Sequence, residues 1–151
     1  MINLALYQPD IPQNVGAAIR LAACLGLTLD IIEPCGFPWN DRKIKQSAMD
    51  YWDLLQLRKH DSWDSFQNTY QGRRILLMTT KGAQPYTDFT FQEGDILLAG
   101  RESAGVPDEV HSAANARLLI PMRGAARSLN VINACAMITG EALRQTHKSA
   151  R

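Results

Sequence analysis

Three short apolar runs constrain the fold of this 151-residue chain more than any other feature. They lie within "RRILLMTT" (73–80), "GDILLAG" (94–100) and "RLLIP" (117–121), and turn-forming or polar residues bound each of them. Short runs of this kind, without polar alternation, are typical of strands buried on both faces, as in parallel sheets. Because segments with a helical pattern alternate with the strands along the chain, the sequence predicts an α/β fold with a mostly parallel sheet.

The remaining segments complete this pattern. Further strands are expected at 2–7, 28–32 and within 53–60, and helices at 15–25, 40–52, 61–72, 107–116 and from 128 to about 146. Asn14 is expected to cap the first of these helices, Gly26 to end it, and Ser128 to cap the last. The sequence contains no linker, repeat or low-complexity segment. We therefore expect residues 1–151 to form a single domain.

Composition limits the classes of function. No apolar run approaches the roughly 18 residues that span a bilayer, and the first residues do not resemble a secretory leader. The three cysteines show no disulfide or zinc-site spacing, and His60, His111 and His147 share no ligand spacing with them. We therefore expect a reduced cytoplasmic protein that has no metal site and carries its histidines at the surface. The net charge of +1 excludes neither nucleic acid nor a small molecule as partner.

Loops after three apolar strands are candidate ligand sites. They are "TTKGAQPY" (79–86), "GRESAGVP" (100–107) and "PMRGAAR" (121–127). In open α/β sheets, ligands bind outside the carboxyl ends of the strands, so the three loops together predict a cradle for a nucleoside. Each loop alone is also compatible with a simple connection. The absence of GxxxxGK[ST], and of GxGxxG after the first strand, disfavours P-loop and Rossmann-type enzymes.

The last helix carries two apolar stripes instead of one. The first contains Leu129, Ile132, Ala136 and Leu143, and the second contains Val131, Cys135, Ile138 and Ala142. A surface helix ordinarily shows a single apolar stripe. Two interpretations remain open: the helix is buried in its own core, or one stripe contacts a second copy of the chain.

Three motifs give the chain a family resemblance. "NVGAAIR" (14–20), "GRESAGVP" (100–107) and "IPMRGAARSLNVINA" (120–134) resemble the three motifs of SPOUT-superfamily RNA 2′-O-methyltransferases. Their order and spacing, with "IEPCGF" (32–37), are similar more narrowly to the tRNA (cytidine/uridine-34-2′-O)-methyltransferase family. The resemblance covers essentially the whole chain, and its third motif is the most specific.

The resemblance implies a fold and a cofactor. It implies the SPOUT fold, an α/β domain with a C-terminal deep trefoil knot, and a homodimer with the knot and the first helix at the interface. It also implies that S-adenosylmethionine binds in the knot loops. The matching cofactor positions are Met78, Thr79, Gly100, Gly105, Ile120, Met122, Ser128, Leu129 and Asn130. Glycines would admit the cofactor closely, and Ser128 at a helix N-terminus would favour its carboxylate.

The implied reaction is methyl transfer to the ribose 2′-oxygen of the wobble nucleotide, cytidine or uridine 34 of tRNA. The resemblance assigns Arg20 to the 2′-hydroxyl, and we expect Asn14 and Glu102 to orient it. A guanidinium does not readily lose a proton. We therefore expect Arg20 to hold the flanking phosphate and stabilise developing alkoxide charge. A surface position, or a salt bridge with Glu102, is the alternative.

Basic residues are candidates for contact with the tRNA anticodon stem-loop. Arg123 and Arg127 fall within the expected active-site loop, where they would bind phosphate. Arg42, Lys43 and Lys45 form a second basic group. The alternative functions are 2′-O-methylation at another tRNA or rRNA position, a non-catalytic RNA-binding module of the same fold, and a small-molecule nucleotide-binding protein.

Three residues depart from the family pattern. Arg101 replaces a common proline, Ala104 replaces a more polar or basic residue, and Gly140 stands where some relatives carry a tyrosine. These departures bear on the details of the site and on the target base. A glycine in the middle of a helix costs about 1 kcal/mol relative to alanine. We therefore expect close packing at Gly140.

Overall fold

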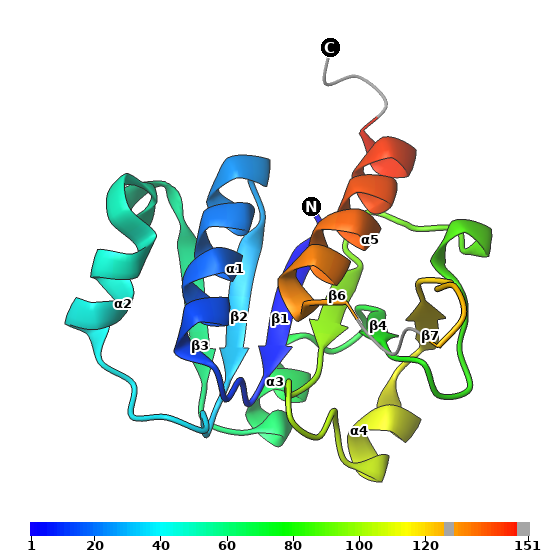
Figure 1. The fold of residues 1–151 in the computed structure, drawn as a ribbon, viewed down its shortest axis with the longest axis horizontal. Helices are drawn as coiled ribbons and strands as arrows, with labels where there is room; N and C mark the ends of the chain where they lie inside the picture. Colours follow the sequence, from blue (N-terminus) through cyan, green and yellow to red (C-terminus); the bar gives the residue numbers. More distant parts are fainter. Residues whose placement is uncertain (126–128, 148–151) are drawn as a thin grey trace.

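A seven-stranded sheet forms the centre of the molecule (Figure 1). The structure is a computed structural model that describes residues 1–125 and 129–147. The strands are β1 (Asn3–Tyr7), β2 (Thr28–Ile32), β3 (Gln56–His60), β4 (Ile75–Met78), β5 (Gln84–Pro85), β6 (Ile96–Ala99) and β7 (Ala116–Leu119). Their order is β3-β2-β1-β6-β4-β7-β5, and every pair of neighbouring strands is parallel. The prediction of an α/β fold with a largely parallel sheet is confirmed.

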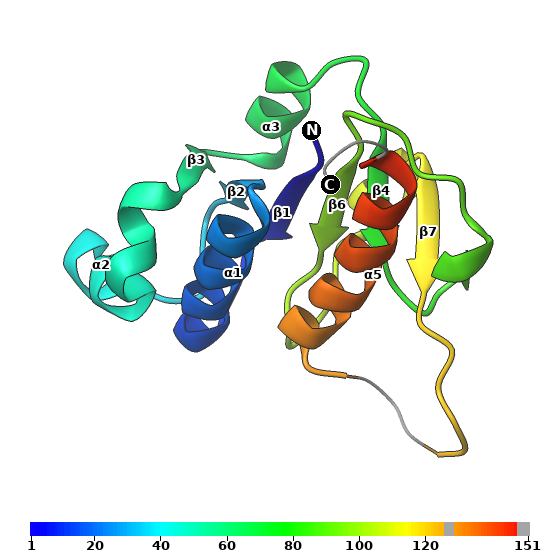
Figure 2. The same cartoon turned by 90° about the horizontal axis from the view of Figure 1, so that it is seen from above.

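Helices cover both faces of this sheet. They are α1 (Pro12–Leu25), α2 (Asp41–Ala48), α3 (Trp63–Thr69), α4 (Asp108–Ala113) and α5 (Val131–Thr146), with 3-10 helices η1 (Met49–Leu54) and η2 (Tyr86–Asp88). Figure 2 shows α1, α2 and α5 on one side of the strands and α3 on the other. Among the described residues, no helix is both long enough and apolar enough to span a membrane.

Two apolar cores follow from this layering. Leu4, Leu29 and Leu97 pack with α1, α2 and α5, whereas Ile96 and Leu98 pack with α3 and α4. Because consecutive strand residues point to opposite faces, Leu97 and Leu98 belong to different cores. Burial on both faces explains why the central strands are apolar without alternation.

Two helix starts differ from the sequence prediction. α1 begins at Pro12, and its N-cap residue is Ile11, so the expected cap by Asn14 is wrong. Proline suits the first helical position because its fixed φ is already helical and it lacks an N–H. α5 begins at Val131 and is capped by Asn130, whose side chain accepts hydrogen bonds from the backbone N–H groups of residues 132 and 133. Ser128, the expected cap, lies outside the described residues. Gly26 ends α1 with φ 69°, as predicted.

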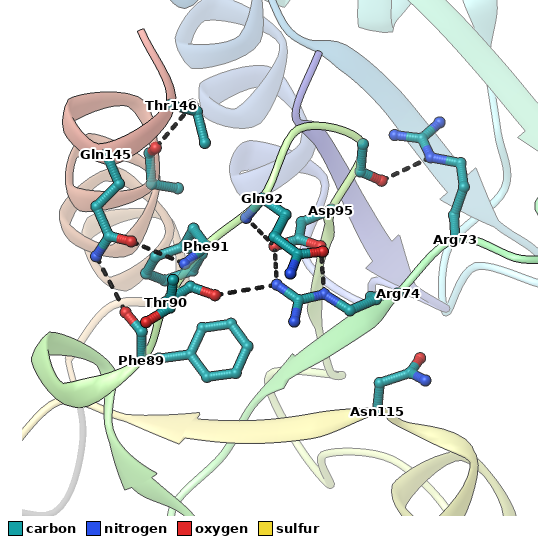
Figure 3. A network of polar contacts seen from close by, with 12 residues as sticks. Arg73, Arg74, Phe89, Thr90, Phe91, Gln92, Asp95, Asn115, Gln145 and Thr146 are labelled. Carbon is teal, nitrogen blue, oxygen red and sulfur yellow. Dashed lines mark hydrogen bonds and ion pairs between the residues drawn. The ribbon is translucent and has the colours of Figure 1, made fainter. Parts of the chain in front are cut away.

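The segment before β6 is fixed by a polar network, drawn in Figure 3. Arg74 makes a bidentate pair with Asp95, with N–O distances of 2.8 and 2.7 Å, and Asp95 is 1% exposed. The Gln145 amide accepts from the backbone N–H of Phe91 at 2.8 Å and donates to the backbone oxygen of Phe89 at 3.0 Å. These bonds attach the segment after η2 to β4 on one side and to the C-terminal turn of α5 on the other.

A buried polar cluster between β2, β3 and α3 corrects another prediction. His60 is 6% exposed, and its Nε2 lies 2.8 Å from Oδ1 of the fully buried Asp30. Tyr70 donates to the same carboxylate oxygen at 2.7 Å, and Asn3 donates to the other at 3.0 Å. The expected surface position of His60 is therefore wrong. The buried carboxylate requires several donors, and the histidine meets part of that requirement.

Candidate active site

A cleft of about 480 Å³ lies beyond the carboxyl ends of β4, β6 and β7. β1, whose carboxyl end leads to Ile11 and Asn14 in the cleft wall, lies between β2 and β6, where the order of strands reverses. A crevice at such a point is the general ligand site of open α/β sheets. The walls include Met78, Thr79, Gly100, Gly105, Ile120, Met122, Leu129 and Asn130. The structure thus brings together every described residue that the sequence predicts for the cofactor.

The loop after β6 is a tight turn closed by its own backbone. The backbone N–H of Arg101 donates to the oxygen of Gly105 at 3.0 Å, and the reverse bond measures 2.9 Å. A Cβ on Gly100 would lie 2.9 Å from the carbonyl carbon of Gly105, and Gly105 itself has φ +64°. The sequence assigns these glycines to close approach of the cofactor. The structure gives them a local reason, because only glycine fits both positions without strain.

A chain of hydrogen bonds runs along the rim of the cleft. Asn14 Nδ2 donates to Glu102 Oε2 at 3.1 Å, and the backbone N–H of Asp10 donates to Glu102 Oε1 at 3.1 Å. Asn130 Nδ2 donates to Asn14 Oδ1 at 3.3 Å. The Ser103 hydroxyl donates to the Asp10 carboxylate, and this bond is the main cause that lowers the pKa of the Asp10 carboxyl. The starts of α1 and α5 are thereby joined to the loop after β6.

Arg20 lies apart from this rim. Its side chain is exposed, it does not line the cleft, and its guanidinium carbon lies 5.2 Å from the ring centroid of Tyr51 in η1. Among residues 1–125 and 129–147, neither Asn14 nor Glu102 forms a hydrogen bond or ion pair with it. The expected orientation by those two residues, and the alternative salt bridge with Glu102, are therefore wrong within one protomer. Six helical positions separate Asn14 from Arg20, which turns the two side chains about 120° apart and shifts them about 9 Å along the axis.

The loop after β7 is only partly described. Met122 lines the cleft, and the neighbouring Arg123 is exposed. Arg127, the second arginine expected to bind phosphate, lies outside the described residues, as does Ser128. The structure therefore places one of the two predicted arginines beside the cleft.

Several cleft residues were not predicted from sequence. Ile11 and Val131 extend the apolar lining of the cleft, and Arg101, in the loop after β6, also lines it. The Arg101 Nε donates to the oxygen of Gly105 at 2.9 Å, and its guanidinium carbon lies 5.6 Å from the ring centroid of Tyr7. Its position directly after Gly100 was the available signal. Within the described ranges, no group of three or more His, Cys, Asp or Glu side chains is arranged to hold a metal ion.

The chemistry of the cleft fits a nucleoside-containing ligand. Ile120, Met122 and Leu129 give an apolar surface, while three strand ends and Asn130 contribute polar groups. Volumes of roughly 300–1,000 Å³ with mostly apolar walls and a few polar groups are usual for cofactor sites. The residues present can therefore hold S-adenosylmethionine.

Comparison with known proteins shows that the chain is similar to RNA methyltransferases. A model of the SpoU rRNA Methylase family matches residues 1–140. A tRNA (cytidine(34)-2′-O)-methyltransferase from Beijerinckia indica is 56% identical over 150 residues, covering 98% of this chain and 94% of the relative. The enzyme of the same name from Escherichia coli K12 is 37% identical, covering 96% and 94%.

Two solved structures are similar to this chain in fold. One that concerns 2-OH methylation of C/U34 on tRNA superposes with a TM-score of 0.90 at 42% identity, covering 96% of this chain and 95% of the other. The SpoU methyltransferase AviRb from Streptomyces viridochromogenes, in complex with AdoMet, has a TM-score of 0.84 at 25% identity, covering 95% and 59%.

Proposed function

This chain belongs to the SpoU rRNA Methylase family, and we propose that it is a tRNA 2′-O-methyltransferase acting on nucleotide 34. The family match confirms the resemblance in the three sequence motifs. The relatives that match over nearly their full length carry this function in their names. The structural observation that supports the proposal most strongly is the cleft, which unites the predicted cofactor residues from three loops.

S-adenosylmethionine is the methyl donor, and when bound it supplies an electrophilic methyl group on its sulfonium. Ile120 and Met122 would bind the adenine through main-chain groups and apolar side chains. Leu129 and Asn130 would contact the cofactor near the start of α5, and Ser128 remains a proposed contact there. The carboxylate of Glu102 accepts two hydrogen bonds within the chain, so we assign it to positioning the loop rather than to removal of a proton.

Arg20 is the proposed contact for the ribose 2′-hydroxyl and its flanking phosphate. Its guanidinium would hold the phosphate and stabilise charge that develops on the 2′-oxygen. Arg20 does not line the cleft of its own protomer. We therefore propose that a second copy of the chain brings its Arg20 to this cleft. Homodimer formation is therefore part of this proposal.

The exposed face of α5 supports a homodimer. Asn133, Ala136, Met137 and Gly140 share one side of the helix, and Met137 is 44% exposed. Apart from its chain neighbours and the nearby helix backbone, no atom of the described residues lies within 4 Å of a Cβ placed on Gly140. The close packing expected there is therefore wrong for one protomer. A partner helix would supply it. Light scattering tests this arrangement: we expect the mass of two chains, and the mass of one chain would contradict it.

We also propose that residues 1–151 form a single domain and that the C-terminal part of this domain is threaded as a deep trefoil knot. The strand order supports this, because β7 lies between β4 and β5 although it follows both in the sequence. A crystal structure with continuous density from β7 to α5 tests the proposal. A path from β7 to α5 that does not pass through the loop between β4 and β6 would contradict it.

The proposed substrate contact is the anticodon stem-loop, with Arg123 and Arg127 on phosphates, in the cytoplasm. The experiment is incubation with labelled S-adenosylmethionine and total tRNA, followed by nucleoside mapping. We expect a methylated ribose at position 34, on cytidine or uridine. Label at another tRNA or rRNA position would identify the first alternative, and RNA binding without label would identify a non-catalytic module. An absence of any effect of RNA would identify a small-molecule nucleotide-binding protein.

A further inference from the structure

A second hollow, which we call the α2–β3 groove, lies at the opposite end of the sheet from β7. Its volume is about 800 Å³, and it is lined by Asp41, Arg42, Lys45, Trp52, Leu55, Leu57 and Lys59. None of these residues lines the cofactor cleft. Figure 2 shows α2 and β3 near one edge of the sheet and β7 near the other, with α1 between α2 and α5.

The rim of the groove is positively charged. Arg42 and Lys45 are exposed on α2, and within the part of the chain that the structure describes neither forms a salt bridge. Lys59 enters from β3, with its Nζ 3.4 Å from Oε1 of Glu33. Asp41, the one carboxylate in the lining, accepts a hydrogen bond of 2.6 Å from the Trp39 indole. Cations therefore outnumber carboxylates at the rim.

The floor of the groove is aromatic and apolar. The half-buried Trp52 of η1 lies in the lining with two leucines. Beside the groove, Lys59 Nζ lies 4.8 Å from the ring centroid of Trp39, and that ring stacks on Phe37 at 6.4 Å with an interplanar angle of 21°. An aromatic floor beside cations, of which Arg42 and Lys45 form no salt bridge among the described residues, matches single-stranded nucleic acid. The bases of such a strand stack while its phosphates pair with Lys and Arg. An acidic peptide would use the cations but not the floor.

We propose that the α2–β3 groove binds an unpaired segment of the tRNA substrate, away from the nucleotide that is methylated. The 3-10 helix η1 links the two places, because Tyr51 stacks against Arg20 and the next residue, Trp52, lines the groove. Because α1, α2 and η1 also pack against one another, we infer that an RNA strand held at Arg20 continues toward Lys45 on α2. The identification of the RNA as tRNA rests on the proposed function. Binding of RNA in the groove is measurable without catalysis.

Two substitutions to glutamate on one helix test the groove. Lys45→Glu removes a groove cation, whereas Gln46→Glu introduces the same side chain at the next residue, an exposed position outside the lining. We expect Lys45→Glu to raise the Kd for tRNA about tenfold, the loss of one charged hydrogen bond. It should also reduce the slope of log Kd against log salt by about 0.7–0.9. Gln46→Glu should change Kd less than about threefold, and neither variant should alter cofactor affinity.

Tryptophan fluorescence tests the stacking. Titration with oligouridylate should quench the wild-type emission, and Trp52→Phe should lose much of that quenching while retaining most of the affinity, because phenylalanine also stacks. Equal effects of Lys45→Glu and Gln46→Glu, or undiminished quenching in Trp52→Phe, would overturn the proposed RNA binding in the groove. Normal methylation with an unchanged KM in Lys45→Glu would overturn it while leaving the proposed function standing. If oligouridylate binding depends on Lys45 and Trp52 as expected but no methyl group is transferred to tRNA, the proposed methyltransferase function is overturned and RNA binding in the groove stands.

Discussion

Asn14 and Glu102 are joined by a hydrogen bond of 3.1 Å, although 88 positions separate them in the chain. Asn14 in turn accepts from Asn130 at 3.3 Å. One amide side chain therefore connects the first turn of α1 to the loop after β6 and to the cap of α5. Because all three residues line the cleft, the shape of the cofactor site depends on this amide.

The first prediction concerns the charge at this position. Asn14→Asp replaces the donor with a second carboxylate facing Glu102, and like charges at this distance repel. We expect the cofactor Kd to rise about tenfold or more in calorimetry. It should rise less in Asn14→Ala, which removes the bonds to Glu102 and Asn130 without adding a charge. Gln13→Asp adds the same charge at an exposed neighbour and serves as the control. An equal loss of affinity in Gln13→Asp would contradict a specific role for Asn14.

The second prediction concerns the cap of α5. Asn130 Oδ1 accepts from the backbone N–H of Ile132 at 2.9 Å and of Asn133 at 3.3 Å. Asn130→Ala leaves these donors without their partner and should lower the free energy of unfolding by about 1 kcal/mol. Asn133→Ala changes an exposed residue inside the helix to a better helix former, so it should be neutral or slightly stabilising. Urea unfolding compares the two variants, and equal midpoints would show that Asn130 does not cap the helix in solution.

The third prediction concerns acid stability near the end of α5. Arg144 donates to both carboxylate oxygens of Glu141 at 2.8 and 2.9 Å, and this pairing, with a bond from Gln145, lowers the Glu141 pKa from 4.5 to about 2. A carboxyl whose pKa is lower in the folded chain stabilises that chain above its unfolded pKa, and the contribution is lost as pH falls toward the folded pKa. Glu141→Gln should therefore be slightly less stable than wild type at pH 6, by a small amount because Arg144 is exposed. Thermal unfolding should show this difference shrinking between pH 4.5 and 2, and a constant difference would contradict the pairing.

The strands and the cofactor loops could be predicted because their signals are local. The apolar runs at 75–78 and 96–99 need burial on both faces, and the loops after them must emerge at one edge of a parallel sheet. Met78, Gly100 and Ile120 meet in the cleft for that reason.

Other features depend on pairings that the sequence does not display. β5 has two residues, Gln84 and Pro85, and is a strand only because β7 lies beside it, so sequence reasoning placed it in a loop. Sequence reasoning started α1 after Asn14 because asparagine is a favoured N-cap. The structure starts the helix at Pro12, a residue that is equally favourable at the first helical position. His60 shows no sign of burial until β2 and β3 pair and place it opposite Ile32, beside the buried carboxylate of Asp30.

The last prediction separates the role of Arg20 in catalysis from its contact with Tyr51. Arg20→Ala should reduce kcat for tRNA methylation by at least about a hundredfold, because a guanidinium that stabilises transition-state charge is lost. The cofactor Kd should stay unchanged, since Arg20 does not line the cofactor cleft of its own protomer and is assigned to the ribose and phosphate of the RNA. Tyr51→Phe keeps the ring beneath the guanidinium and should keep most of the activity. If Arg20 acts across a dimer, mixing inactive Arg20→Ala chains with inactive chains altered in the cleft, such as Gly100→Val, should restore part of the activity. Near-normal turnover by Arg20→Ala would remove Arg20 from the mechanism, and failure of the mixed chains to recover activity would place its action within one protomer.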